Sequence, residues 1–216
     1  TRYKLGDRKA MSGASLGVLR KDRDREVLLK RHGILSNKAQ TLEEIGQQLG
    51  ITRERVRQIE KAALTRLRTE DASNQGFSDA VTDLLAQSGG ILRFDSIVGE
   101  LTDPETGAEL GFLIRTNPRF VFVEKNDQHA SIVASTTSYD AAAVRELHDT
   151  IVAAIKASGK PAKFDKIAGR IDGPHQSESL LELARASERI AELEDLWGLS
   201  NWPEVNPKSI RDKVYL

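Results

Sequence analysis

The sequence predicts a mainly α-helical fold, in which a three- or four-helix helix-turn-helix domain precedes two small α+β domains that each end in a β-hairpin. Three observations support this prediction. Residues 41–68 carry the capping and turn signals of two consecutive helices. Residues 77–216 align with themselves at an offset of 70, which indicates two copies of one domain. In the first copy, RFVFVEKNDQHASIVAS has the composition of two strands joined by a turn.

Composition excludes several kinds of site. The 216 residues include no cysteine, so the chain has neither disulfides nor thiolate metal ligands. Its four histidines are scattered without a ligand pair at helical spacing, and no metal or cofactor is expected. No apolar run approaches the roughly 20 residues that cross a bilayer, so we expect a cytoplasmic protein without a membrane partner. The chain begins at Thr1 and is expected to be a fragment of a longer protein.

The two parts of the chain carry opposite charge, although the net charge is zero. Residues 1–76 contain 17 Lys and Arg against 10 Asp and Glu, whereas residues 77–216 contain 15 against 22. A basic domain is attracted to phosphate through counterion release, so the expected partner of the first part is double-stranded DNA. The acidic remainder is expected to contact protein, with DNA binding as the alternative.

The chain opens with a basic arm or linker, residues 1–18, that shows no sustained period. A first helix is expected to begin after Asp22 or Asp24, either of which can cap it, and to stop at Gly33. This helix opens the helix-turn-helix domain, which we expect to span residues 19–72.

The next segment, TLEEIGQQLG, predicts a second helix with a sharp end. Thr41 opens it, and Glu44 completes a capping box in which each side chain binds the other residue's amide. Gly46 lies inside the helix at a cost of roughly 1 kcal/mol relative to alanine, which indicates that another element crosses closely there. Gly50 supplies a left-handed residue that ends the helix, and Thr52 can cap the following one.

That following helix, RERVRQIEKAALTRLR, has one apolar and one charged face. At about 100° per residue, Val56, Ile59, Ala63 and Leu67 fall on the inward arc. The opposite arc carries groups that pair with base edges, since arginine binds guanine, glutamine binds adenine and glutamate accepts from cytosine. Its members are Arg53, Glu54, Arg57, Gln58 and Lys61. Arg55 lies at the border of this arc, where it is better placed for phosphate. A solvated charged face without a partner is the alternative.

These residues resemble region four of bacterial primary sigma factors, whose recognition helix reads the upstream, minus-thirty-five promoter element; the preceding REVLLKRHGI resembles the first part of that region. The resemblance implies a contact with RNA polymerase. It matches Arg53, Glu54, Arg57 and Gln58 to base-reading positions and Arg31, Thr41 and Arg55 to backbone-facing positions. The predicted DNA-binding residues are Arg31, Thr41, Thr52, Arg53, Glu54, Arg55, Arg57, Gln58 and Lys61. The family usually carries a lysine where this chain has Ala62, so the base preference at that end of the site is not predicted.

The repeat predicts two further domains, over residues 77–140 and 145–216. Identical pairs at the offset of 70 include the Ser-Gly and Phe-Asp dipeptides of both copies. Each copy is expected to begin with an amphipathic helix, over residues 78–87 and 146–157. A further helix follows in each copy, and Asp95 and its counterpart Asp165 can act as caps.

The hairpins that end the copies are expected to turn at Asn126-Asp127 and at Glu194-Asp195, with Trp197 filling the core of the second. Three helices followed by a hairpin make a winged helix. The pattern resembles the HARE-HTH family of winged-helix domains, related to the delta subunit of bacterial RNA polymerase; LWGLSNW followed by NPKSIRDKVYL carries the likeness most clearly. A truncated helix is expected over residues 209–216.

Motifs for catalysis are absent: the chain has no GxxxxGK[ST] phosphate loop and no nucleophile motif, so no enzyme activity is expected. The predicted function is that of a sigma-factor-like transcription regulator, which binds double-stranded DNA sequence-specifically and contacts RNA polymerase, in part through its acidic repeats. Two alternatives remain. The chain can be the DNA-targeting module of a larger restriction or defence enzyme whose catalytic domain lies outside it, or an interaction scaffold whose helix-turn-helix binds protein only.

Overall fold

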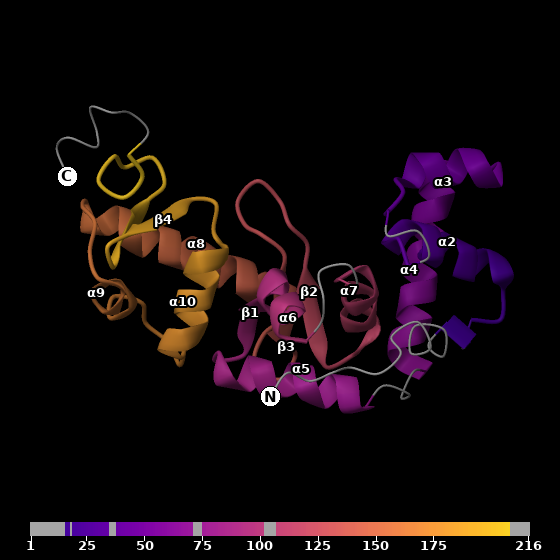
Figure 1. Ribbon diagram of the computed structural model, residues 1–216, viewed down its shortest axis with the longest axis horizontal. Helices are drawn as coiled ribbons and strands as arrows, with labels where there is room; N and C mark the ends of the chain where they lie inside the picture. The colour runs from indigo at the N-terminus through magenta and orange to yellow at the C-terminus, as the bar shows by residue number, and fades with distance from the viewer. Residues whose placement is uncertain (1–15, 18, 35–37, 71–74, 102–106, 208–216) are drawn as a thin grey trace. The chain divides into compact units, whose positions relative to one another are not determined.

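The computed structural model describes residues 16–17, 19–34, 38–70, 75–101 and 107–207. The described chain is mainly helical and contains two small antiparallel sheets (Figure 1). Its elements are α2 (Asp22–His32), α3 (Leu42–Leu49), α4 (Arg53–Glu70), α5 (Gln75–Gln87), β1 (Ile91–Arg93), α6 (Phe94–Leu101), α7 (Gly107–Thr116), β2 (Phe120–Val123), β3 (Ile132–Ser135), α8 (Ala141–Ser158), α9 (Phe164–Ala168), α10 (Ser177–Ala186), β4 (Ile190–Leu193) and β5 (Leu196–Leu199). Within these ranges, no helix combines the length and the apolar character that a membrane span requires.

The chain forms two compact units. The first contains the described residues of Thr1–Thr82 and Ser96–Phe120, and the second contains those of Asp83–Asp95 and Val121–Leu216. These units cut across the first predicted copy of the repeat, because α7 belongs to the first unit whereas β1 and β3 belong to the second.

Short-range signals shape the helix-turn-helix in the first unit. Glu44 donates its amide to Thr41 Oγ1 at 3.2 Å, and Thr41 donates its amide to the Glu44 carboxylate at 2.7 Å, which confirms the predicted capping box. Gly50 ends α3 in the left-handed conformation, at φ 64°. A Cβ on Gly46 would lie 2.7 Å from the carbonyl oxygen of Ile51, so the turn between the two helices is the element that crosses closely there.

The inward face of α4 is buried as the sequence predicts. The exposed fraction is at most 8% for each of Val56, Ile59, Ala63 and Leu67. Val56 and Ile59 pack with side chains of α2 and α3, whereas Ala63 and Leu67 pack further along with Leu28 of α2. The predicted cap of α2 is wrong, because Lys21 occupies the cap position without a side-chain bond. The aspartates lie inside the first turn, where their charge still suits the positive end of the helix.

Helix α7, from the first repeat, completes the core of the first unit. Its Phe112 is fully buried in the same cluster as Leu28, Ala63 and Leu67. Arg68, near the end of α4, donates hydrogen bonds to the carbonyls of Arg115 at 2.7 Å and Phe120 at 3.0 Å. The helix-turn-helix therefore shares its core with a segment that follows it in the chain.

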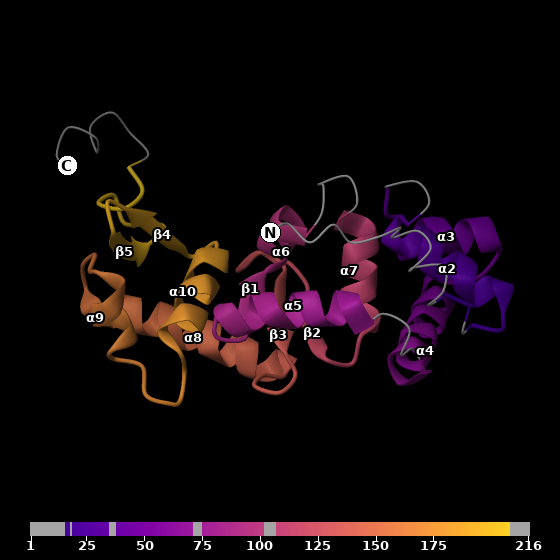
Figure 2. The ribbon, with the colours of Figure 1, turned by 60° about the horizontal axis from the view of Figure 1, so that its bottom comes forward.

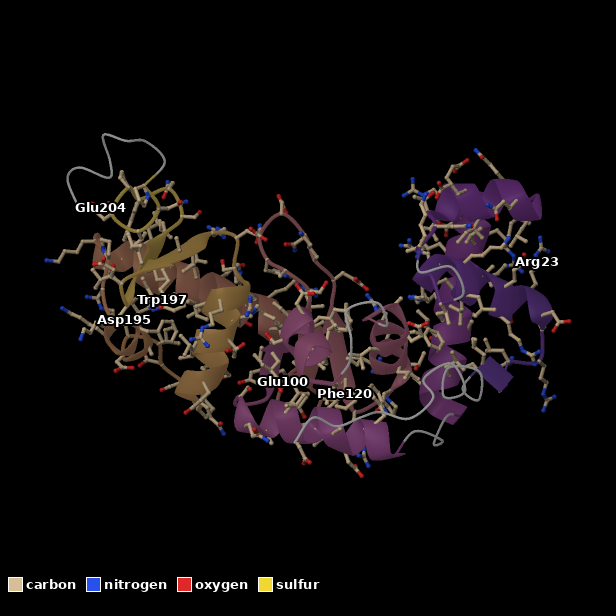
Figure 3. All side chains as sticks on the ribbon, in the orientation of Figure 1. Arg23, Glu100, Phe120, Asp195, Trp197 and Glu204 are labelled. Carbon is tan, nitrogen blue, oxygen red and sulfur yellow. The ribbon has the colours of Figure 1, made fainter. Side chains whose placement is uncertain are left out.

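In the second unit, strand order is β1-β3-β2, and β4 pairs only with β5 within the described sheets. Glu194 and Asp195 connect β4 to β5 with positive φ values of 50° and 63°, which confirms the predicted turn. Trp197 is 4% exposed and its ring meets that of Phe164 edge to face, with centroids 5.2 Å apart (Figure 3). Side chains of α8, α9, α10 and the β4–β5 hairpin pack into one apolar cluster. Figure 2 shows the course of these four elements.

Several elements and contacts of the two predicted copies lie 70 residues apart, the offset of the repeat. Elements α7 and α10, and likewise β2 and β4, begin and end 70 residues apart. Arg119 pairs with Asp79 at 3.0 Å, and at the same offset Arg189 pairs with Asp149 at 3.4 Å. Just before these arginines, the side chain of Asn117 bonds to that of Ser78, as Ser187 does to His148 at 2.8 Å.

Several predicted boundaries within the repeats are wrong. Helix α5 begins three residues earlier than expected, and α8 begins at Ala141, because Asp140 caps it through the amides of Ala142 and Ala143. Asp165 does not cap α9, since the helix already begins at Phe164. In β2 the two terminal residues, Phe120 and Val123, are the buried ones. The helix expected over 209–216 and most of the arm expected over 1–18 lie outside the described residues.

Candidate nucleic-acid interface

The first two and a half turns of α4 present a continuous polar surface. All five side chains of the predicted base-reading arc, which we call the reading arc, are exposed while the opposite side of the helix is buried. The reading arc consists of Arg53, Glu54, Arg57, Gln58 and Lys61. Thr52 fixes the start of this helix, because its hydroxyl accepts the amide of Arg55 at 3.2 Å. The arc therefore lies at a helix N-terminus, the part of a recognition helix that meets base edges.

Within this surface the polar groups bind one another. Arg57 donates two hydrogen bonds to the Glu54 carboxylate, from Nε at 2.8 Å and from Nη2 at 2.6 Å. Gln58 donates to the same carboxylate at 3.4 Å and accepts from Arg55 at 3.2 Å. The hydrogen bond from Arg57 lowers the pKa of Glu54, and that bond in turn raises the pKa of Arg57. Glu54 is thus ionised at neutral pH and holds Arg57 in one orientation.

The residues predicted to face the DNA backbone, Arg31, Thr41 and Arg55, each have a partner within the chain. Thr41 is exposed, but its hydroxyl donates to Glu44 at 2.9 Å as well as accepting the Glu44 amide. Arg31 is half-buried and donates to the carbonyl of Gln40 at 3.0 Å, next to Thr41. Its Nε lies 3.4 Å from the carboxylate of Glu60 on α4. Arg31 therefore links α2 to α4 and to the loop that precedes α3. This structural role does not depend on a DNA contact.

Behind the reading arc, a buried polar cluster connects α2, α4 and α7. His32 lies 3.7 Å from Glu60, and its ring stacks obliquely on Phe112 with centroids 5.5 Å apart. Burial, with additional repulsion from Arg115 and Arg31, lowers the pKa of His32 to about 3. The ring is therefore neutral at physiological pH.

Two basic side chains of α2, Arg23 and Lys30, bind groups of α3. Arg23 of α2 donates to the Leu49 carbonyl at the end of α3 at 3.1 Å (Figure 3). Lys30 binds Glu26 at 2.9 Å and Gln48 at 2.7 Å. These contacts hold the two helices that support α4. Pattern-based prediction missed these supports because they join residues 18 to 26 positions apart.

The part of the chain that the structure describes holds no candidate metal centre. No group of three or more His, Asp or Glu residues there could hold a metal ion. The chemistry available at this surface is hydrogen bonding and charge, which suits recognition of a phosphate backbone and base edges.

The segment that contains this interface is similar to known proteins. The family model of Sigma-70, region 4, matches residues 21–69. RNA polymerase sigma factor SigA of Listeria monocytogenes serovar 1/2a (strain ATCC BAA-679 / EGD-e) is 48% identical over 54 residues, which are 25% of this chain and 14% of that protein. Every residue of the predicted DNA-binding site lies inside the segment that the family model matches. Residues 21–69 are thus similar to a sigma-factor helix-turn-helix, and the likeness of the repeats to HARE-HTH domains stays a prediction.

Proposed function

We propose that this chain binds double-stranded DNA sequence-specifically through α4 and acts in transcription, as sigma factors do. The observation that carries the proposal is the reading arc: five exposed polar side chains at the start of a helix whose other side is buried, inside a segment similar to Sigma-70 region 4. Arg53, Arg57 and Gln58 would bind base edges, with Glu54 accepting from cytosine or orienting Arg57. Such a protein works on the chromosome, in the cytoplasm, without catalysing a reaction itself.

Backbone contacts would fix the register of α4 in the major groove. Arg55, Thr52 and Lys61 are exposed at the edges of the arc. Arg31 reaches α4 at Glu60 and binds the carbonyl of Gln40, the residue before Thr41. Phosphate contacts carry affinity that falls with salt, whereas base contacts carry specificity. The two groups of residues should therefore differ in how their removal acts on specific and on random duplexes.

The proposal is tested by selecting bound sequences from a random duplex pool and measuring affinity for the winner and for a scrambled duplex. Arg57→Ala should weaken binding to the selected duplex about 5- to 150-fold, the range of one bidentate base contact. Arg66→Ala is the matched control, because Arg66 is an exposed arginine of the same helix outside the reading arc. Equal effects of the two substitutions would refute base reading by Arg57.

We also propose RNA polymerase as a partner, since the relative in Listeria is named as an RNA polymerase sigma factor. Titration of labelled chain with core polymerase, read by fluorescence anisotropy, tests this contact without DNA. If the chain binds the selected duplex well but does not bind polymerase, the result would instead favour a DNA-targeting module of a larger enzyme.

A further inference from the structure

The third helix of each repeat is the one that a winged helix inserts into DNA, yet α7 offers no open face. The outer side of α10 carries two glutamates, Glu178 and Glu182, which a phosphate backbone would repel. In α7 the buried residues are Glu109, Leu110, Gly111, Phe112, Leu113, Ile114 and Thr116. In α10 the exposed residues are Ser177, Glu178 and Arg185. A helix that is buried on nearly all sides, as α7 is, cannot place its side chains along a groove.

The helix-turn-helix covers α7. Phe112 packs fully buried against Leu28 of α2 and Leu67 of α4, and its ring also meets His32. Arg68 reaches from α4 to the carbonyl of Arg115, in the last turn of α7, and so neutralises the negative end of that helix. Both apolar and polar contacts therefore join α7 to the DNA-binding segment.

The first repeat's strand β1 and its preceding turn cover one side of α10. Ile91 of β1 belongs to one buried cluster with Leu180 and Leu183 of α10. A Cβ on Gly89 would lie 2.9 Å from the amide nitrogen of Ser179, so the turn lies directly on the helix. Each third helix is thus packed against the segment of chain that precedes its own repeat.

One position of the repeat shows how the two contacts differ. The residue 70 positions after Phe112 is Glu182, which pairs with Arg185 at 2.9 Å on the solvent side of α10. The phenylalanine is therefore not needed for the core of a repeat, because the equivalent site accepts a glutamate. Its role in α7 is the contact with α2 and α4.

We infer that the third helix of each repeat serves to pack its repeat against the preceding segment of the chain. For α7, this packing holds α4 in its DNA-binding position. Phe112 and Arg68 are positioning residues for the reading arc, although neither touches DNA. This inference rests on the proposed function for its DNA arm only, since the contact between α7 and the helix-turn-helix exists without a ligand.

The test uses the full chain with Phe112→Glu, the residue found at the equivalent position of α10. Hydrogen exchange without DNA should show faster exchange of amides in α2 and α4. Affinity for the selected duplex and for a random duplex should both fall about tenfold or more, because the apparent Kd rises as the reciprocal of the competent fraction. Arg68→Gln, which removes two hydrogen bonds without exposing the core, should give the same pattern more weakly and serves if the first variant does not fold.

Two variants of α10 are the matched controls. Leu183→Ala should loosen the second unit and leave α4 exchange and DNA affinity unchanged. Arg185→Ala should leave both the Kd and its salt dependence unchanged, since α10 does not touch DNA. Unchanged α2 and α4 exchange in both Phe112→Glu and Arg68→Gln, or a smaller salt slope in Arg185→Ala, would overturn the inference. A wild-type chain that binds no duplex would refute the proposed function, while the exchange measurement would still decide the role of α7.

Discussion

Replacing Gly46 by alanine should destabilise the chain, although alanine favours helices. The new Cβ would lie 2.7 Å from the carbonyl oxygen of Ile51, about 0.7 Å inside the ordinary contact distance of 3.4 Å. That oxygen cannot move freely, because Ile51 donates its own amide back to the Gly46 carbonyl at 2.9 Å and Arg53 begins α4 two residues later. Overpacking of this kind costs about 1–3 kcal/mol, whereas the gain in helix propensity is about 1 kcal/mol. The steric cost should therefore win, by up to about 2 kcal/mol.

Gly99→Ala is the matched control for this substitution. Gly99 is an exposed glycine of α6, in the same unit, and a Cβ there would meet nothing within 4 Å. This change should stabilise the chain by about 0.5–1 kcal/mol through backbone entropy alone. Urea unfolding followed by helical circular dichroism gives both free energies of unfolding. If Gly46→Ala proved as stable as Gly99→Ala, the close approach of the turn to α3 would not be a real constraint.

Three further predictions concern the reading arc and its support. Glu54→Ala should strengthen binding to random duplex and reduce the ratio of specific to random affinity, because it removes a negative charge and releases Arg57. Band-shift titrations of both duplexes measure this ratio, and an unchanged ratio would contradict the prediction. Arg31→Ala should lower the free energy of unfolding and reduce the salt slope of DNA binding by about one unit. Arg31→Lys should retain the salt slope but not the full stability. An unchanged unfolding midpoint in Arg31→Ala would argue against the contacts to Gln40 and Glu60. His32 has a pKa of about 3 in the folded chain, so the unfolded chain binds its proton first and stability falls as pH drops below 6.5, by about 1.4 kcal/mol per pH unit. His32→Leu should flatten the urea midpoint between pH 5.5 and 4.5 relative to wild type, and parallel pH profiles would show that the ring is not buried.

The helix-turn-helix could be predicted in detail because its signals are local. The capping box of Thr41 and Glu44, the left-handed Gly50 and the apolar period of α4 each depend on residues within one or two turns. The same is true of the second hairpin, whose turn at Glu194 and Asp195 lies between two short apolar runs. Local chemistry determines such features regardless of what packs on them.

Contacts between segments could not be predicted in this way. Nothing in the residues around Phe112 indicates that it packs against α2 and α4, because that contact joins segments far apart in the chain. The start of α8 at Ala141, five residues before the predicted start, is determined by the cap that Asp140 provides. The pairing of Glu54 with Arg57 was within reach of prediction, since residues three apart on a helix are neighbours.

That pairing bears on how α4 could discriminate between sequences. In the free chain, Arg57 already has two hydrogen bonds to Glu54, so a base must replace them rather than bind an unpaired group. A base that offers two acceptors in the same geometry replaces both hydrogen bonds of Arg57, so the free energy of this exchange is close to zero. The phosphates then add their attraction for the basic side chains. A base with one acceptor or with a donor leaves part of the guanidinium or the carboxylate unpaired in a desolvated groove, which is costly. Affinity would then come mainly from charges such as Arg55 and Lys61, and specificity from the cost of disrupting the Glu54–Arg57 pair for the wrong sequence.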